Sequence, residues 1–203
     1  MIAIIDYAMG NLGSVKNILK RIGVPSEITN DAQRIRNAQK IILPGVGSFN
    51  SGMQNLSKGG LDELLSELVL IEKIPILGIC LGAQLMLNGS EEGHCKGLSF
   101  VPGNVVKFNN DNSNLRVPHM GWTHVQRLKS CGLTDQLPVE PRFYFVHSYH
   151  FKMENKKDEL LQSEYIYPFC SAFQQDHIMG VQFHPEKSHK FGMALLRNFT
   201  EQV

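Results

Sequence analysis

Short continuous apolar runs alternate with helical spacings through the first half of the chain. Ile2–Ile5 and Lys40–Leu43 have the length and character of buried strands. The first run is followed by apolar residues at i, i+3, i+4 and i+7, namely Val15, Ile18, Leu19 and Ile22. Because the runs are continuous rather than alternating, and helices separate them, the pattern predicts a three-layer α/β fold whose central, mostly parallel sheet has helices on both faces.

Further elements are predicted before residue 81. A weak strand at Ser26–Thr29 precedes a short helix around Ala32–Ala38. A longer helix is marked by Leu61, Leu64, Leu65 and Leu68. Another apolar run then begins at Ile74 and leads to Cys80.

After Gly97 the pattern changes to short strands with few helices between them. The candidates are Val101–Phe108, Gly121–Val125, Phe143–Tyr149 and Ser171–Phe173. They predict a small antiparallel extension of the sheet. Ile178–Phe183 returns to a buried strand, and a closing helix follows with Ser188 as its cap and an apolar stripe of Phe191, Leu195 and Phe199. The polar segments Asn109–Asn114 and Glu154–Glu159 are predicted surface loops. We interpret residues 1–203 as a single domain.

Composition narrows the classes of partner. The formal charge of +1 gives no bulk electrostatic reason to expect nucleic acid or a membrane surface, so a small molecule or a protein is favoured. The four cysteines show no Cys-x-x-Cys spacing and no histidine cluster accompanies them, so we expect neither a metal nor another cofactor. With no basic, apolar leader at its start and no run of membrane-spanning length, the chain is expected to be cytoplasmic with reduced thiols.

Cys80 lies in a Gly-Ile-Cys-Leu-Gly turn between an apolar run and a helical pattern. This arrangement is the cysteine analogue of the strand-turn-helix elbow that presents a serine nucleophile. The flanking Gly78 and Gly82 let strand and helix close around strained backbone, and the start of a helix favours a thiolate. A buried core cysteine is the alternative, and the turn alone leaves the two interpretations evenly balanced.

A second motif is Gln-Phe-His-Pro-Glu at residues 182–186, at the end of a predicted strand. In extended backbone His184 and Glu186 point the same way, so the carboxylate can orient the imidazole while its other nitrogen takes a thiol proton. Alone, the motif is more typical of a surface turn. Together with the Cys80 elbow it favours a nucleophilic Cys-His-Glu site.

A third motif is Pro-Gly-Val-Gly at residues 44–47, directly after a buried strand. Its two glycines permit a backbone that points N–H groups at an oxyanion. A flexible turn or a weak phosphate loop is the alternative. The Gly-Lys-Ser/Thr ending of a nucleotide-binding loop is missing here, which disfavours nucleotide binding.

Taken together, these motifs resemble those of class I glutamine amidotransferases. Four segments narrow the resemblance to the glutaminase subunits of imidazole glycerol phosphate synthases: Asp-Tyr-Ala-Met-Gly-Asn-Leu at 6–12, Pro-His-Met-Gly-Trp at 118–122, Phe-Tyr-Phe-Val-His-Ser-Tyr at 143–149, and the segment 182–188. The resemblance extends from the first predicted strand to the last helix.

The resemblance implies hydrolysis of L-glutamine to L-glutamate and ammonia. Cys80 would be the nucleophile, His184 the proton relay and Glu186 the group that orients His184. It implies that Val46 and Gly47 supply oxyanion N–H groups after a peptide flip. The residues implied to bind glutamine, the last two through their backbone, are Gly45, Gln84, Glu92, Ser148 and Tyr149.

The resemblance also implies a heterodimer with a (β/α)8-barrel cyclase that uses the ammonia to make imidazole glycerol phosphate and aminoimidazole carboxamide ribotide in histidine biosynthesis. Asn11, Trp122, Tyr144 and Lys187 match the family's interface positions. For Trp122 and Tyr144 the alternative is a role as ordinary core aromatics.

Three positions depart from the family pattern: Ala8 replaces a glycine, Thr123 replaces an asparagine, and residues 165–169 lack a Tyr-Gly pair. The segment 187–193 is similar to paralogues that supply ammonia to a sugar-amidating synthetase in surface-polysaccharide synthesis. A non-catalytic, partner-binding α/β protein is a further alternative. The intact His-Pro-Glu disfavours it.

Overall fold

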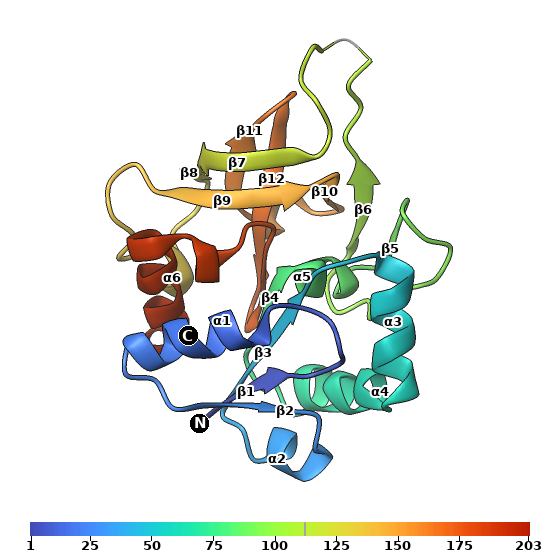
Figure 1. The fold of residues 1–203 in the computed structure, drawn as a ribbon, viewed down its shortest axis with the longest axis vertical. Coiled ribbons are helices and arrows are strands. Elements are labelled where there is room, and N and C mark those ends of the chain that lie inside the picture. The colour runs from blue at the N-terminus through green and yellow to red at the C-terminus, as the bar shows by residue number, and fades with distance from the viewer. Residues whose placement is uncertain (112) are drawn as a thin grey trace.

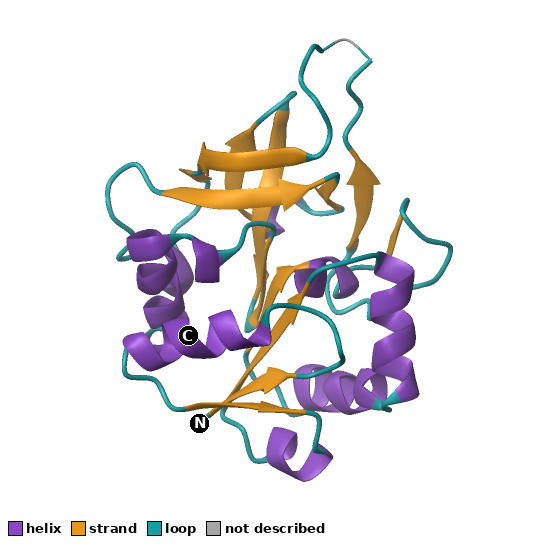
Figure 2. Cartoon of the chain, viewed as in Figure 1, coloured by secondary structure: helices purple, strands orange, loops and turns teal. Residues whose placement is uncertain are grey.

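Five parallel strands form one half of the central sheet (Figures 1 and 2). The computed structural model describes residues 1–111 and 113–203, so Asn112, in the predicted loop 109–114, lies outside the described residues. In sheet order the parallel strands are β2 (Ser26–Thr29), β1 (Ile2–Ile5), β3 (Lys40–Gly45), β4 (Ile76–Cys80) and β13 (Ile178–Val181). The expected alternation of strands and helices in this half is confirmed, and the structure adds a helix at Phe49–Lys58 that the sequence pattern did not predict.

The sheet continues beyond β13 with mainly antiparallel pairing. In sheet order the next strands are β12 (Pro168–Gln175), β10 (Tyr149–Met153), β6 (Gly103–Lys107) and β5 (Gly89–Ser90), with β11 (Glu159–Glu164) pairing β12 and β8 (Gln126–Arg127). A separate antiparallel pair is formed by β7 (His119–His124) and β9 (Arg142–His147), which lies above the helices in Figure 1. The predicted antiparallel extension is therefore confirmed.

Helices cover both faces of the parallel strands. One face carries α1 (Leu12–Arg21) and α6 (His189–Glu201); the other carries α2 (Ala32–Arg36), α3 (Phe49–Lys58), α4 (Leu61–Ser66) with the π-helical turn Glu67–Ile71, and α5 (Leu81–Leu85) (Figure 2). Short 3-10 turns span Gly132–Thr134, Lys156–Asp158 and Pro185–Lys187. Among the described residues no helix combines the length and apolar character needed to cross a membrane.

The continuous apolar runs are explained by two cores, one on each side of the sheet. Side chains alternate along a strand, so Ala3 and Ile5 join the core under α3 and α4, whereas Ile2 and Ile4 pack against α1 and α6. All four residues of β1 are buried. Neither face of these strands is left for polar residues, which is why the sequence shows no alternation there.

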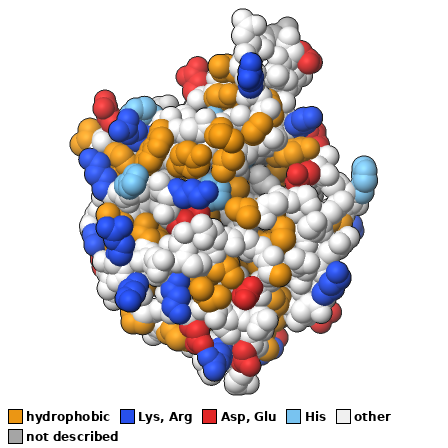
Figure 3. All heavy atoms as spheres, in the orientation of Figure 1, with side chains coloured by type: hydrophobic (Ala, Val, Ile, Leu, Met, Phe, Trp, Pro, Cys, Tyr) orange, Lys and Arg blue, Asp and Glu red, His pale blue; other side chains and the backbone are white. Residues whose placement is uncertain are grey.

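The sheet formed by β7 and β9 has one buried and one outward face. Phe143, Phe145 and His147 are buried, whereas their neighbours along β9 are more exposed. On β7, Met120 and Trp122 are exposed. Figure 3 shows hydrophobic side chains gathered among Lys and Arg on the face of the molecule where β7 and β9 lie in Figure 1.

The structure corrects several predicted elements. Phe143–Tyr149 is not one strand, because the chain passes at Ser148 from β9 in one sheet to β10 in the other. The predicted loop 154–159 contains a 3-10 turn and ends in the first residue of β11. Ser188 does precede α6, but its hydroxyl makes no capping bond; it donates to the His184 carbonyl at 2.6 Å instead.

The Cys80 elbow depends on glycines at close backbone contacts. A Cβ on Gly82 would lie 1.8 Å from the Leu43 carbonyl oxygen, and one on Gly78 would lie 2.5 Å from the Ala83 Cα. Strand β4 and helix α5 can therefore approach β3 only because these positions lack a side chain.

Gly82→Ala is expected to lower the free energy of unfolding by about 3 kcal/mol, because the backbone has to move to admit the methyl group. The matched control is Gly13→Ala in α1, where a Cβ would meet nothing within 4 Å. That variant should gain about 0.5–1 kcal/mol from helix propensity. Urea unfolding of both variants measures the difference, and a Gly82→Ala variant as stable as wild type contradicts the close contact.

Candidate functional site

Three strand ends bring the sequence motifs together at one edge of the parallel sheet. Gly45, the last residue of β3, pairs with Cys80, the last residue of β4. On the other side of β4, Val181 pairs with Ile79, and the chain continues directly to His184. This carboxyl edge is where open α/β sheets commonly carry their sites.

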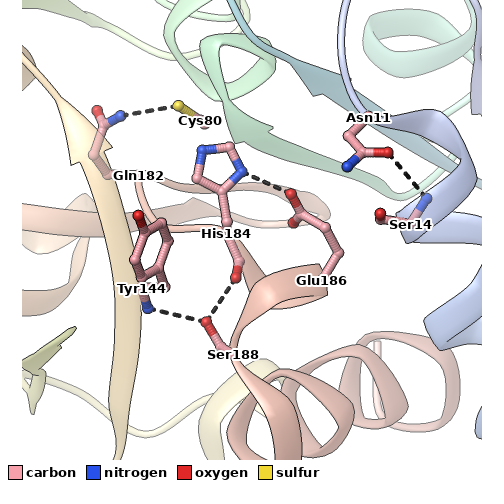
Figure 4. A network of polar contacts seen from close by, with 8 residues as sticks. All are labelled: Asn11, Ser14, Cys80, Tyr144, Gln182, His184, Glu186 and Ser188. Atoms are coloured by element: carbon pink, nitrogen blue, oxygen red, sulfur yellow. Dashed lines mark hydrogen bonds and ion pairs between the residues drawn. The ribbon is translucent and has the colours of Figure 1, made fainter. Parts of the chain in front are cut away.

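Cys80 lies at the tip of a strained turn. Its φ of 52° and ψ of −113° put a non-glycine residue in a sparsely populated region, as expected for a nucleophile elbow. The residue is 7% exposed, and the Gln182 amide Nε2 donates to its Sγ at 3.7 Å (Figure 4). Cys80 is therefore buried, but its sulfur contacts a polar side chain, and the residue lines a cavity that is described below.

The His184 ring lies between Cys80 and Glu186 (Figure 4). Its Nδ1 is 2.7 Å from the Glu186 Oε1, and the two side chains are 1% and 3% exposed. Since a carboxylate oxygen accepts, Nδ1 carries a hydrogen and Nε2 is the nitrogen available to Cys80. The backbone is fixed as well, because the His184 N–H donates to the Tyr144 carbonyl at 2.9 Å and the Tyr144 N–H donates to Ser188 Oγ at 3.0 Å.

The neighbours of His184 favour its charged form. Burial lowers the pKa of the ring, but hydrogen bonding and charge from Cys80 and Glu186 outweigh burial and raise the pKa to about 10. The site therefore holds an imidazolium next to the sulfur at neutral pH. Such a pair supplies a nucleophile and a proton donor in contact with the same cavity.

This pKa has a consequence for stability. A folded-state value near 10 against an ordinary 6.5 means that the folded chain retains a proton that the unfolded chain releases in this interval. The stability that wild type gains from protonated His184 is therefore complete below pH 6.5. It is lost as pH rises through about 10. We expect the difference in free energy of unfolding between wild type and His184→Gln to shrink across that interval, as measured by urea unfolding. A difference that grows with pH contradicts the imidazolium assignment.

A cavity of about 310 Å³ opens beside these groups. Both Cys80 and His184 line it, and six of the residues expected in an oxyanion or glutamine-binding role line it too: Val46, Gly47, Gln84, Glu92, Ser148 and Tyr149. Gly47 has a φ of +115°, a conformation that favours glycine. The structure therefore gathers residues from five separated segments around one space.

Gly45 is the exception among the expected binding residues, since it is absent from the cavity lining. A Cβ at this position would lie 2.2 Å from the Tyr7 hydroxyl and 2.9 Å from the Gly82 N. Its small size is explained by packing behind the elbow. A direct glutamine contact is not needed to account for it.

The polar side chains of the cavity are already oriented by the protein. Glu92 Oε2 accepts from the Phe49 N–H at 2.8 Å, and within residues 1–111 and 113–203 no donor is found for Oε1. Gln84 Nε2 donates to the Gln182 Oε1 at 3.1 Å and to the Tyr149 carbonyl at 3.4 Å. Both of its amide hydrogens are thereby used, so only its Oε1 remains for a ligand.

Several residues around the cavity were missed from the sequence. The cavity is also lined by Leu81, Pro118, Val146 and His147. Leu81 follows the nucleophile in the elbow, and the N–H of that residue commonly completes an oxyanion hole, so its position was a usable signal. Gln182 stands in the 182–186 motif, but its contact with Cys80 joins residues 102 apart in the chain and could not be derived from spacing.

Three of the four expected interface residues, Trp122, Tyr144 and Lys187, lie at the outward face of the β7 and β9 pair, whereas Asn11 lies apart from them at the start of α1. Trp122 is 42% exposed and its ring is 5.6 Å from the parallel His189 ring, so it is not a core aromatic. Lys187 Nζ lies 5.7 Å from the centre of the Tyr144 ring, and Arg142 lies 5.8 Å from that of Trp122. Asn11 is exposed and accepts from the Ser14 N–H at the start of α1. We call Met120, Trp122, Arg142, Tyr144, Lys187 and His189 the aromatic-cationic patch.

Comparison with known proteins places this geometry in a family. The family model for class-I glutamine amidotransferases matches residues 3–203. Two similar relatives are the imidazole glycerol phosphate synthase subunit HisH 2 of Methanococcus maripaludis, 54% identical over 100% of both chains, and the subunit HisH of Leptospira interrogans, 46% identical over 98% of both.

Solved structures show the same fold at low identity. A glutamine amidotransferase crystal structure superposes with a TM-score of 0.76 at 16% identity, covering 99% of this chain and 98% of that one. PurLQS from Thermotoga maritima gives a TM-score of 0.73 at 13% identity, covering 98% and 96%. The chain belongs to the class-I glutamine amidotransferase family and, within it, to the HisH glutaminase subunits of imidazole glycerol phosphate synthase.

Proposed function

We propose that this chain hydrolyses L-glutamine to L-glutamate and ammonia through Cys80, His184 and Glu186, as the glutaminase subunit of an imidazole glycerol phosphate synthase in histidine biosynthesis. The observation that carries the proposal is the assembly of a strained cysteine and a carboxylate-bound imidazole beside one cavity. Membership of the HisH group supports the pathway.

In the first half of the reaction the Cys80 sulfur attacks the side-chain amide carbon of glutamine, and a C–S bond forms. His184, protonated because Cys80 and Glu186 raise its pKa, gives its Nε2 proton to the amide nitrogen. The C–N bond then breaks, ammonia leaves and a thioester remains. Glu186 accepts from Nδ1 and holds the ring in the Nδ1–H form throughout.

In the second half a water attacks the thioester carbon while neutral His184 accepts the water's proton. The C–S bond breaks, glutamate is released, and the thiolate and imidazolium are restored. Both halves pass through a tetrahedral oxyanion. We assign its stabilisation to backbone N–H groups of Val46, Gly47 and Leu81, three residues that line the cavity.

Glutamine selectivity is assigned to the polar groups around the cavity. Glu92 Oε1 is free to accept from the α-amino group, because Oε2 is held by the start of α3. Gln84 offers its remaining Oε1, and the Ser148–Tyr149 segment closes the cavity nearby. Fixing both ends of the substrate aligns its amide carbon with Cys80.

The ammonia is passed to a cyclase subunit, for which we propose a (β/α)8 barrel. Ammonia released into water at neutral pH would be protonated and lose its nucleophilicity, so the glutaminase has to be sealed against its acceptor. The aromatic-cationic patch is suited to this because exposed aromatic and cationic side chains are typical interface anchors. Lys187 follows Glu186 directly, so the patch and the site share one segment.

Trp122→Ala is expected to weaken the complex with the cyclase by about 2 kcal/mol, or roughly 30-fold in Kd, because the patch loses a large exposed aromatic ring. Isothermal titration of this chain with the cyclase subunit from the same source measures the change. The matched control is Ile71→Ala, since Ile71 is 75% exposed on the π-helical turn away from β7. Equal weakening by both variants would contradict the assigned surface.

The function is tested by glutamate release from glutamine, for the chain alone and with the cyclase subunit, with and without its imidazole-precursor nucleotide. Strong stimulation by cyclase and nucleotide together is expected. Release that depends on Cys80 but ignores the cyclase would move the acceptor to a sugar-amidating synthetase, an alternative that the HisH relatives do not favour. No release under any condition would support a non-catalytic partner-binding protein.

A further inference from the structure

Two histidines that the reaction does not use lie on the buried face of the β7 and β9 pair. His119 and His147 are opposite each other in the strand register and are 2% and 6% exposed. Their rings are connected, with His119 Nδ1 3.0 Å from His147 Nε2. His147 also lines the cavity beside Cys80.

The hydrogen-bond partners fix which nitrogen carries hydrogen in each ring. His147 Nδ1 is 2.7 Å from the Tyr149 carbonyl, which can only accept, so Nδ1 donates. In a neutral ring Nε2 then accepts, so His119 Nδ1 donates to it. His119 Nε2 is left as an acceptor, and the Thr123 hydroxyl 2.8 Å away donates to it. Donors and acceptors alternate along the whole path without conflict.

Both rings are neutral and immobilised. Burial lowers the pKa of His147 to about 3 and that of His119 to about 4. His119 is stacked between aromatic rings, with its centroid 4.1 Å from that of Tyr165 and 4.9 Å from that of Phe145. Ring rotation would break both stacking and hydrogen bonds, so packing fixes the orientation of the His119 ring, while the Tyr149 carbonyl, which can only accept, fixes the tautomers.

The path continues from Tyr149 to the nucleophile. The Tyr149 carbonyl also accepts from Gln84 Nε2, the same amide donates to Gln182 Oε1, and Gln182 Nε2 donates to Cys80 Sγ. Because Gln182 Oε1 has to accept from Gln84 Nε2, the Gln182 amide cannot rotate by 180° to exchange its oxygen and nitrogen. The orientation of the amide beside Cys80 is therefore set by groups that begin at Thr123 on an outer strand.

We propose that Thr123, His119 and His147 form a neutral hydrogen-bonded relay that positions the Tyr149 carbonyl, and through it Gln84, for binding glutamine. The three are positioning residues and touch neither the reacting carbon nor the leaving nitrogen. The inference rests on the proposed function, because it takes the cavity to be the glutamine site. Thr123, at the position where the family pattern has asparagine, becomes the first donor of the relay.

The test compares two substitutions of His119. His119→Phe keeps the stacked ring but removes the donor to His147, whose tautomer is then free to reverse and release the Tyr149 carbonyl. We expect KM for glutamine to rise about 10-fold, with kcat changed less than about threefold. His119→Asn loses the stacking but places an amide N–H where Nδ1 was, so KM should return to within about threefold of wild type.

If His119 had a purely structural role, His119→Asn would be the more damaged of the two variants, and the damage would appear in apparent kcat and not in KM. His119→Asn loses more packing than His119→Phe, so lower stability would reduce its active fraction and hence its apparent kcat, while KM stayed constant. Thermal unfolding of both variants reports that loss separately. Equal KM values for wild type and His119→Phe overturn the proposal.

A second measurement needs no activity and keeps the relay testable if a variant fails to fold. Two-bond ¹H–¹⁵N spectra of the wild-type rings should show both His119 and His147 as neutral Nδ1–H tautomers. An Nε2–H tautomer for His147 overturns the relay. Absence of Cys80-dependent glutamine hydrolysis in wild type would instead contradict the proposed function. The spectra would still show which tautomers His119 and His147 adopt, so the two failures can be told apart.

Discussion

Cys80→Ala is expected to lower kcat for glutamine hydrolysis by roughly 10⁶-fold, since loss of a nucleophile costs about as much as loss of the whole catalytic group. The alanine leaves the cavity and the His184–Glu186 pair in place but offers no atom that can form a bond to the amide carbon. Glutamate release, measured with and without the cyclase, gives the comparison. With ammonia supplied in place of glutamine, the complete synthase should still turn over, because the acceptor site is on the other subunit.

Cys131→Ala is the matched control for this prediction. Cys131 is half-buried and belongs to the core beneath α6 rather than to the cavity lining. The control removes a thiol from the same chain and should leave glutamate release within about twofold of wild type, as expected away from the site. Residual activity in Cys80→Ala near the wild-type level would refute the covalent mechanism.

Glu186→Gln is expected to lower kcat by about 10⁴-fold, the magnitude seen when the orienting carboxylate of a triad becomes an amide. The amide matches the carboxylate in size but is uncharged, and its NH₂ can donate to Nδ1. His184 then loses the partner that holds its Nδ1–H form and one of the two groups that raise its pKa. The wrong tautomer of His184 and the loss of its Nε2 proton would both slow the release of ammonia.

The pH–rate profile distinguishes this effect from general damage. In Glu186→Gln the loss of imidazolium should begin at lower pH than in wild type, because Glu186 helps to raise the pKa of His184. Glu201→Gln, an exposed residue at the end of α6, is the matched control and should keep the wild-type profile. A Glu186→Gln enzyme with reduced kcat but an unchanged profile contradicts the assigned role.

The sequence predicted the place of the site because continuous apolar strands separated by helices form parallel sheets covered on both faces. Once β3, β4 and β13 are parallel neighbours, the residues after each strand meet at one edge, so Val46, Cys80 and His184 converge. Local spacing was also enough for His184 and Glu186, which are two residues apart and in contact.

Elements that depend on distant partners could not be predicted in the same way. The Glu-Leu-Leu-Gln-Ser-Glu of β11 has good helix formers, yet pairing with β12 and β8 makes it a strand. Between β9 and β10 no glycine or proline marks the change of sheet at Ser148. There the tertiary fold decides where the chain bends.

Side-chain networks were beyond the sequence for a similar reason. The amide of Gln182 reaches a thiol on another strand, and His119 meets His147 across a register that spacing does not reveal. Ser188 shows the converse, since its place before α6 suggested a cap, whereas its hydroxyl holds the His184 backbone. Which polar atoms meet in a core depends on strand order.

Mass spectrometry of the chain after reaction with 6-diazo-5-oxo-L-norleucine, an electrophilic analogue of glutamine, tests the central claim most directly. The structure holds four free cysteines, and of these Cys80 alone lines the cavity among the described residues. We predict a single adduct on Cys80 that excess glutamine prevents and that His184→Gln slows. An adduct on another cysteine, or one that glutamine does not prevent, would contradict a glutamine site built on Cys80.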